Sequence, residues 1–152
     1  MRIHPITFRV ERGITGATDE NCRAIVSKLD QIMGPVDRHY EYSGLEVVDR
    51  VEPSRGSPDV LPLGDYPLRI DCWRSDKVMG GMMQVGENGE GICRTGTDRI
   101  PTIADPAFGF FRQTAQHEFG HVHGLDISDQ RYKSFVAFDN TGVAPILTLD
   151  GR

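Results

Sequence analysis

Apolar and polar residues alternate in several short segments of the chain, which is the pattern of strands with one buried face. Residues 6–10 and 67–73 show it most clearly, and strands are also expected around 45–51 and at 92–95. The segment 79–85 contains two adjacent glycines, which suit an edge strand better than a central one. The pattern therefore predicts a sheet of about five strands.

Two other segments have apolar residues spaced as on one face of a helix. The first begins at Thr18 or Asp19, either of which can cap a helix, and Gly34-Pro35 ends it. The second begins near Asp105-Pro106, and Gly124 is placed to end it. The first stripe is Cys22, Ile25, Val26, Leu29, Ile32 and Met33, and the second is Phe108, Phe111, Ala115, Phe119 and Val122. We therefore expect an α+β fold, a single domain over 1–152 with two long helices covering one sheet.

The composition agrees with one globular domain: 152 residues, 38% hydrophobic and 26% charged. A net charge of −5 with scattered basic residues argues against a nucleic-acid partner. No apolar run approaches membrane-spanning length, so no membrane partner is expected. The N-terminal residues lack the apolar core of a secretory signal, so an extracellular location would require a leader absent from this sequence.

The three cysteines, Cys22, Cys72 and Cys93, are too few for a disulfide framework. Their spacing matches no zinc knuckle, and we expect them to be small buried residues. Pairing of Cys72 with Cys93 stays open.

The candidate chemistry lies on the second predicted helix, at His117-Glu118-Phe119-Gly120-His121. Two histidines four residues apart project from one helix face, so their imidazoles can bind one tetrahedral zinc ion. Glu118 lies roughly 100° around the helix from His117, where a carboxylate can act as general base on water that the metal activates. His123 lies about 200° from His121 and is not expected to be a ligand. The alternative is a helix whose histidines are only solvated or hydrogen-bonded.

The stretch from His117 to Asp126 resembles the zinc-binding helix of the matrixins, the matrix-metalloproteinase branch of the metzincins. The resemblance implies a metzincin-like twisted mixed sheet whose fourth strand is an antiparallel edge, followed by the helix that carries His-Glu-x-x-His. It also implies that substrate peptide pairs with that edge strand. The edge residues here would be Gly81, Met82, Met83, Gln84 and Val85.

The chain departs from the matrixin pattern at the third zinc ligand. The third histidine of the family falls on Ile127, and no methionine follows Met83 to form the family's Met-turn. Aspartate is the remaining oxygen donor, and the candidates are Asp126, Asp129, Asp139 and Asp150. Side chains alternate along an extended chain, which puts Asp129 on the side of Ile127. Asp129 is therefore the favoured third ligand, with Asp126 as the alternative.

Two functions follow from these residues. The first is a zinc-dependent endopeptidase that hydrolyses peptide or protein substrates with Glu118 as general base. The second is a degenerate metzincin-fold protein that binds a partner or serves a structural role without catalysis. The missing third histidine favours the second function. The retained Glu118 favours the first, because a structural zinc site needs no general base.

Overall fold

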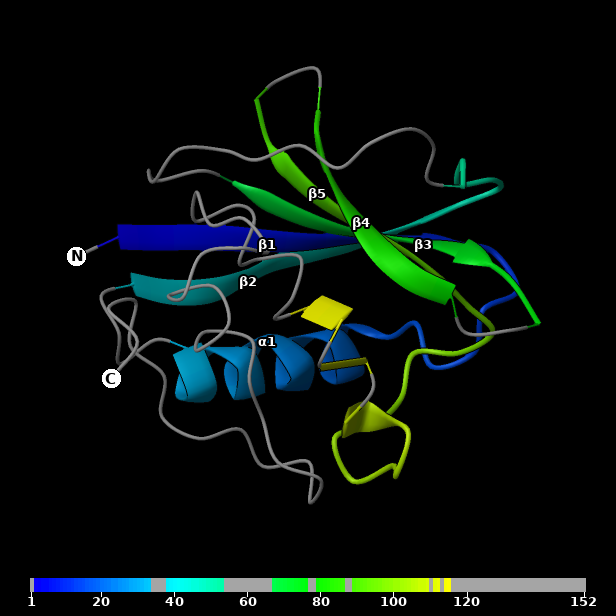
Figure 1. Cartoon of the computed structure of the whole chain (residues 1–152). Coiled ribbons are helices and arrows are strands. Elements are labelled where there is room, and N and C mark those ends of the chain that lie inside the picture. The colour runs from blue at the N-terminus through cyan, green and yellow to red at the C-terminus, as the bar shows by residue number, and fades with distance from the viewer. Residues whose placement is uncertain are drawn as a thin grey trace.

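The computed structural model describes residues 2–33, 38–53, 67–76, 79–86, 89–109, 111–112 and 114–115. These residues contain five strands and one long helix, and Figure 1 shows the sheet lying over that helix. The elements are β1 (Arg2–Glu11), α1 (Asp19–Met33), β2 (Arg38–Val48), β3 (Leu68–Arg74), β4 (Met79–Val85) and β5 (Gly91–Thr97). Further helical residues are present at 108–109, 111–112 and 114–115.

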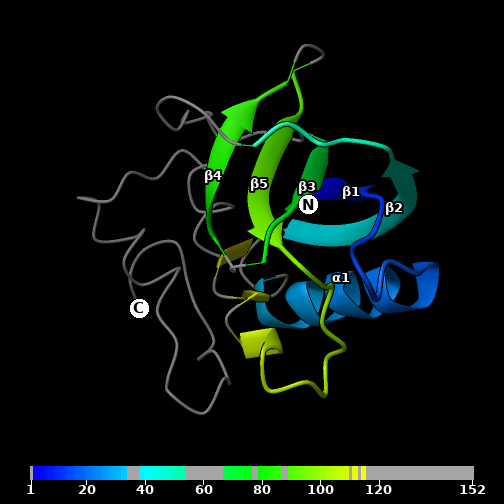
Figure 2. The same cartoon turned by 90° about the vertical axis from the view of Figure 1, so that its right-hand side faces the viewer.

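The strands lie in the order β2-β1-β3-β5-β4, which can be followed across the sheet in Figure 2. The first four of these run parallel to one another. Parallel neighbours need a crossover connection, and α1 supplies the one between β1 and β2. At the far edge, β4 runs antiparallel to β5.

The predicted fold class, an α+β metzincin-like mixed sheet with two long helices, is wrong. Four consecutive parallel strands and one long helix among the described residues make this an α/β fold. The alternation of side chains does not encode strand direction, which is set by crossovers between distant segments. Alternation also does not show whether one face or both are covered. In β3 the polar residue Asp71 is buried as fully as its apolar neighbours Ile70 and Cys72. The predicted order of the strands and the first helix, and the antiparallel edge position of 79–85, are confirmed.

The first helix begins where the sequence predicts, because Thr18 caps it. The hydroxyl oxygen of Thr18 accepts a hydrogen bond from the backbone N–H of Asn21 at 3.1 Å. Four residues of the predicted stripe are buried against the sheet: Cys22, Ile25, Val26 and Leu29. The side chains of Ile32 and Met33 and the predicted stop at Gly34-Pro35 lie outside the described residues.

The second strand starts earlier than the predicted range of 45–51, because a bulge interrupts its alternation. Ile6 pairs with Tyr42 but the next residue, Thr7, pairs with Gly44, so one extra residue is inserted into β2. Gly44 has a φ of 136°, a conformation that favours glycine. Before the bulge the core-facing residues of β2 have even numbers, as at Tyr42, and after it they have odd numbers, as at Leu45. The alternation of apolar and polar residues is therefore broken, and the first half of the strand was not predicted.

The core lies between the sheet and the helical residues. Ile6, Phe8 and Val10 of β1 are fully buried in it. The second predicted stripe contributes three buried residues, Phe108, Phe111 and Ala115, which confirms its described part. Figures 1 and 2 show these helical residues on the same side of the sheet as α1. The rest of that stripe, Phe119 and Val122, lies outside the described residues.

The opposite face of the sheet carries a row of charges centred on Asp71. In register, Arg9 of β1 neighbours both Glu46 of β2 and Asp71 of β3, and Asp71 neighbours Arg94 of β5. The Asp71 side chain is 1% exposed. Arg69 donates two hydrogen bonds to the Asp71 carboxylate, from Nε to Oδ1 at 2.6 Å and from a terminal nitrogen to Oδ2 at 3.1 Å. A paired carboxylate is therefore built into the middle of the sheet.

The two arginines beside Asp71 depend on it for charge compensation. Arg94 approaches the carboxylate at 3.7 Å, and Arg69 also reaches Glu90 at 3.3 Å. Burial on its own lowers the pKa of Arg69, but hydrogen bonding to Asp71 and the neighbouring carboxylate charges outweigh it and raise the pKa overall.

Asp71→Asn should lower the free energy of unfolding by about 2–3 kcal/mol, because it leaves two partly buried guanidinium groups without their shared counter-charge. The effect is smaller than for a dry ion pair, since the arginine side chains are about one-fifth exposed. Urea unfolding followed by fluorescence of Trp73, the only tryptophan, measures it. Asp49→Asn is the matched control, because Asp49 pairs with Arg12 in solvent and should leave the midpoint nearly unchanged. An unchanged midpoint for Asp71→Asn would contradict this account.

Candidate functional site

The residues of the predicted zinc site lie outside the part of the chain that the structure describes. They are His117, Glu118 and His121, with Asp129 and Asp126 as candidates for the third ligand. The last described residue, Ala115, is helical and stands two positions before His117 in the sequence. Phe111 and Ala115, one helical turn apart, are both buried in the core. The structure thus describes the helical segment that leads up to the motif.

The start of this helical segment is anchored by Asp105. Its carboxylate accepts a hydrogen bond from the backbone N–H of Ala107 at 2.8 Å, and its backbone carbonyl accepts one from Phe108 at 2.9 Å. Asp105 therefore caps the start of the helical segment, which confirms the predicted start near Asp105-Pro106. Arg112, one turn further on, is 1% exposed, a buried cation that the apolar pattern did not reveal.

The predicted substrate strand, Gly81 to Val85, forms the C-terminal part of β4. Its backbone pairs with β5 from Met82 opposite Arg94 to Val85 opposite Gly91. Among the described residues, no strand pairs with the other side of β4. An edge strand offers unpaired backbone N–H and C=O groups to an extended peptide. Binding of substrate along this edge stays a prediction.

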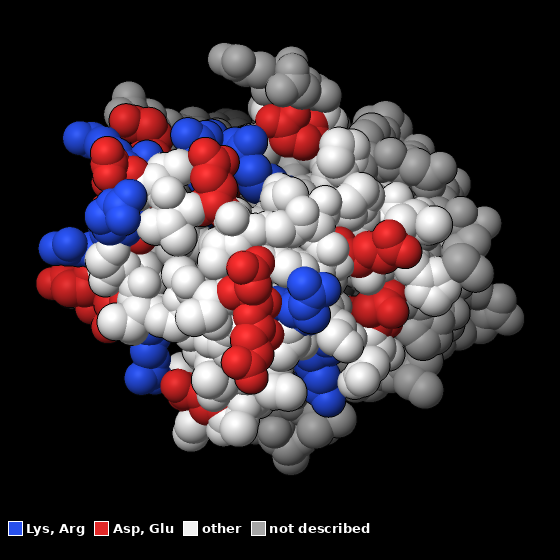
Figure 3. All heavy atoms as spheres, turned by 180° about the vertical axis from the view of Figure 1, so that it is seen from behind, with Lys and Arg blue, Asp and Glu red and all other residues white. Residues whose placement is uncertain are grey.

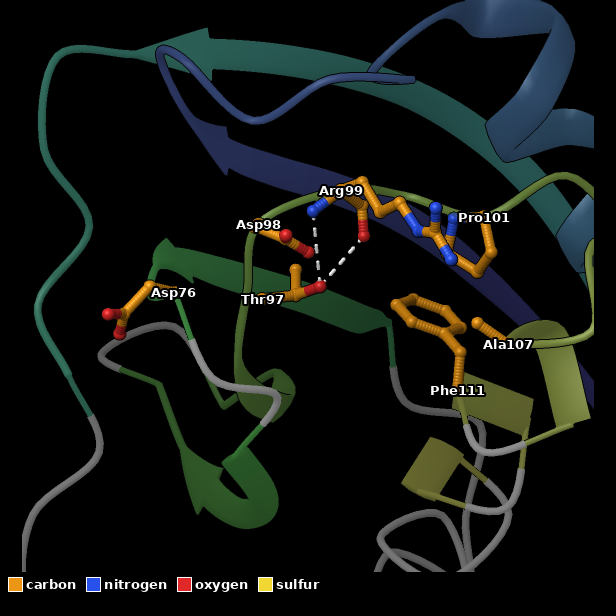
Figure 4. Close-up of a pocket in the computed structure, with 7 residues that line it drawn as sticks. All are labelled: Asp76, Thr97, Asp98, Arg99, Pro101, Ala107 and Phe111. Carbon is orange, nitrogen blue, oxygen red and sulfur yellow. Dashed lines mark hydrogen bonds between the residues drawn. The ribbon is translucent and has the colours of Figure 1, made fainter.

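A cavity of about 530 Å³ lies at the carboxyl ends of β3 and β5 (Figure 4). Ligands of parallel sheets bind outside this end of the strands. The cavity is lined by Asp76, Thr97, Asp98, Arg99, Pro101, Ala107 and Phe111. The backbone N–H of Ser75 donates to the carbonyl of Thr97 at 3.1 Å and holds the two strand ends together.

The loop from Thr97 to Arg99 is fixed by its own hydrogen bonds. The buried hydroxyl of Thr97 donates to the carbonyl of Arg99 at 2.7 Å and accepts from the Arg99 N–H at 3.3 Å. The guanidinium of Arg99 reaches the carboxylate of Asp105 at 3.3 Å, so the loop is also tied to the helical segment. Figure 4 shows the Arg99 side chain directed toward Pro101.

The cavity has an acidic side and an apolar side. Asp76 and Asp98 are exposed, and neither carboxylate forms an ion pair with a described side chain. Pro101 and Phe111 are buried and present apolar surface. The sequence did not predict this cavity, because Asp76 stands more than twenty positions before the other lining residues, which begin at Thr97. Polar residues directly after two apolar strands, at 75–76 and 97–99, were the available signal.

The three cysteines are buried and form no disulfide with one another, as expected for small core residues. Burial and the nearby Asp19 charge raise the pKa of Cys22 to about 12. Burial raises the pKa of Cys72 as well, with a smaller contribution from Asp71. Neither thiol has the character of a reactive nucleophile at neutral pH.

Within the described residues, no group of three His, Cys, Asp or Glu side chains could hold a metal ion. No helix in the described part of the chain is long and apolar enough to cross a membrane. On the face seen in Figure 3, acidic and basic side chains of the described residues stand next to one another in small groups. A scan against models of protein families found no match for the chain, and a search of curated proteins found no relative.

Proposed function

We propose that the protein is a zinc-dependent endopeptidase with Glu118 as its general base. The observation that carries the proposal is the place of the His-Glu-x-x-His segment in the chain. It comes two positions after a helical segment whose residues Phe108, Phe111 and Ala115 are buried in the core. At about 100° per residue, the predicted helix turns His117 about 200° and His121 about 240° away from buried Ala115. Both imidazoles are then expected on the side of the helix that faces away from the core.

The donor set of this segment suits zinc. Two neutral imidazoles and one carboxylate, from His117, His121 and Asp129 or Asp126, are ligands that zinc accepts in catalytic sites with a fourth position left open. When bound there, zinc polarises a peptide carbonyl and lowers the pKa of water to about 7. The resemblance of residues 117–126 to the matrixin helix supports the same assignment.

Glu118 supplies the proton transfers that hydrolysis needs. Its carboxylate takes a proton from the attacking water and delivers it to the leaving amine, so that one group serves both steps. A glutamate between the two ligands has no role in a purely structural zinc site. The edge strand β4 supports the proposal, because its outer backbone groups can hold an extended peptide by strand addition.

A binding or structural protein without catalysis is the second candidate. Ile127 favours it, because an aliphatic side chain stands where the matrixins have a third histidine. Such a protein would retain its fold and its partner but would not turn over peptides. Zinc content and peptide cleavage together distinguish the two functions.

His121→Ala should lose most of the bound zinc, because one of two imidazole ligands is removed. Elemental analysis of protein prepared without chelator should find close to one zinc per chain in the wild type. His123→Ala is the matched control, since the predicted helix directs His123 away from the site, and it should keep its zinc. Equal zinc content in all three proteins would contradict the assignment.

Asp129→Ala should weaken zinc binding by orders of magnitude if this carboxylate completes the site, whereas Asp126→Ala should leave the affinity close to that of the wild type. Competition with a chromogenic chelator measures both affinities. A loss confined to Asp126→Ala would identify Asp126 as the ligand. Unchanged affinity in both variants would exclude both aspartates.

Glu118→Gln should retain the fold and the zinc but reduce cleavage of an unstructured protein such as casein by on the order of 10²–10⁴. Glutamine keeps the shape of the side chain and cannot accept the proton. Glu20→Gln, on the exposed first turn of α1, is the control and should cleave at the wild-type rate. If zinc-loaded wild type cleaves no faster than Glu118→Gln across several unstructured substrates, the enzyme is excluded and the second candidate remains.

A further inference from the structure

The cavity at the carboxyl ends of β3 and β5 is not used by the proposed proton transfers. Its volume of about 530 Å³ lies within the roughly 300–1,000 Å³ typical of small-ligand sites. Its walls have opposite character, with the carboxylates of Asp76 and Asp98 on one side and Pro101, Ala107 and Phe111 on the other. Figure 4 shows Asp98 nearer to this apolar side, whereas Asp76 lies at the far rim with its carboxylate pointing away from it.

This combination matches a side chain that has a long apolar stem and a cationic head. Lysine and arginine bury their methylene groups against apolar surface and keep their charge at a polar rim. The aromatic ring of Phe111 can pack against such a stem. The carboxylate of Asp98, which forms no ion pair with a described residue, can then neutralise the head group. Asp76 adds negative charge at the outer rim.

The one cation among the lining residues does not oppose this occupant. Arg99 forms an ion pair with Asp105 at 3.3 Å, which offsets its charge. Its guanidinium extends toward Pro101, away from the carboxylate of Asp98 (Figure 4). Asp98 therefore sets the charge preference of the cavity, with a weaker contribution from Asp76 at the outer rim, and both repel an anionic ligand.

The cavity also lies at the end of the edge strand. Met79, the first residue of β4, pairs with Gly96, and the lining residues Thr97, Asp98 and Arg99 follow Gly96 directly. A peptide that extends past the Met79 end of β4 would bring a side chain to the cavity. We propose that this cavity is a specificity subsite for a lysine or arginine side chain of the polypeptide substrate. The substrate role depends on the proposed endopeptidase function, whereas binding of the cationic side chain does not.

The test is a titration that needs no catalysis. Nα-acetyl-lysine methylamide and its uncharged analogue, Nα-acetyl-norleucine methylamide, are added separately to the full-length protein while backbone amide NMR signals are recorded. The lysine compound should shift the amides of Thr97, Asp98 and Arg99 and bind about threefold to tenfold more tightly than the norleucine compound. This range corresponds to one exposed ion pair with Asp98 and a weaker attraction by Asp76, and it should shrink as salt is raised.

Asp98→Asn and Asp76→Asn should each reduce the preference for the lysine compound. Glu41→Gln is the charge-matched control, because Glu41 is an exposed residue of β2, at the opposite edge of the sheet, and should leave the preference unchanged. Equal binding of the two compounds, shifts confined to other residues, or an unchanged preference in both aspartate variants would overturn the proposal.

Cleavage assays separate this proposal from the proposed function. Lysine binding at the cavity without any peptide cleavage would exclude the endopeptidase and retain a site for basic side chains. Cleavage without lysine binding at these residues would exclude the subsite and retain the enzyme.

Discussion

The parallel pairing of β3 with β5 is the constraint on which the candidate site depends. Seven residue pairs, from Leu68 opposite Gly91 to Arg74 opposite Thr97, bring the carboxyl ends of the two strands together. Asp76 leaves one strand and Asp98 leaves the other, so both reach one cavity. The same pairing fixes β4 at the edge and directs the chain after β5 toward the helical segment that contains Phe108, Phe111 and Ala115. The cavity and the helical segment that precedes His117 in the sequence therefore share one structural cause.

Two contacts specify the register of that pairing. Asp71 lies opposite Arg94, and Trp73 lies over Gly96, where an added Cβ would stand 2.6 Å from the indole. A slip by one residue would move the guanidinium of Arg94 to the other face of the sheet and put a side chain beneath the tryptophan. Both changes would destabilise the slipped pairing. The buried ion pair of Asp71 and the glycine at position 96 therefore both favour the observed register of β3 and β5. Asp71 thus matters to the position of the cavity although it is not one of its lining residues.

The features predicted correctly from the sequence depend on the spacing of neighbouring residues. The features missed depend on contacts between segments that are distant in the sequence. The strands at 6–10, 67–73, 79–85 and 92–95 and the Thr18 cap are local features, and the structure confirms them. The fold class was wrong, because parallel direction arises from crossovers that no local pattern records. The first half of β2 was missed because one inserted residue shifted the alternation. The cavity was missed because it exists only after β3 and β5 have paired. The predicted zinc ligands need only the helical period, so they could be proposed from sequence alone and remain untested.

The distribution of charge indicates where selection among substrates can arise. A net charge of −5 attracts basic polypeptides at a distance, but long-range attraction raises encounter rates without choosing a residue. On the described surface seen in Figure 3, several acidic groups stand beside basic ones, and paired charges of this kind have short-ranged fields. Asp98 and Asp76 form no ion pair with a described residue, and both line a cavity that also has the apolar surface of Phe111. Discrimination between side chains requires charge and apolar contact within one bound geometry, and the β3–β5 cavity provides both.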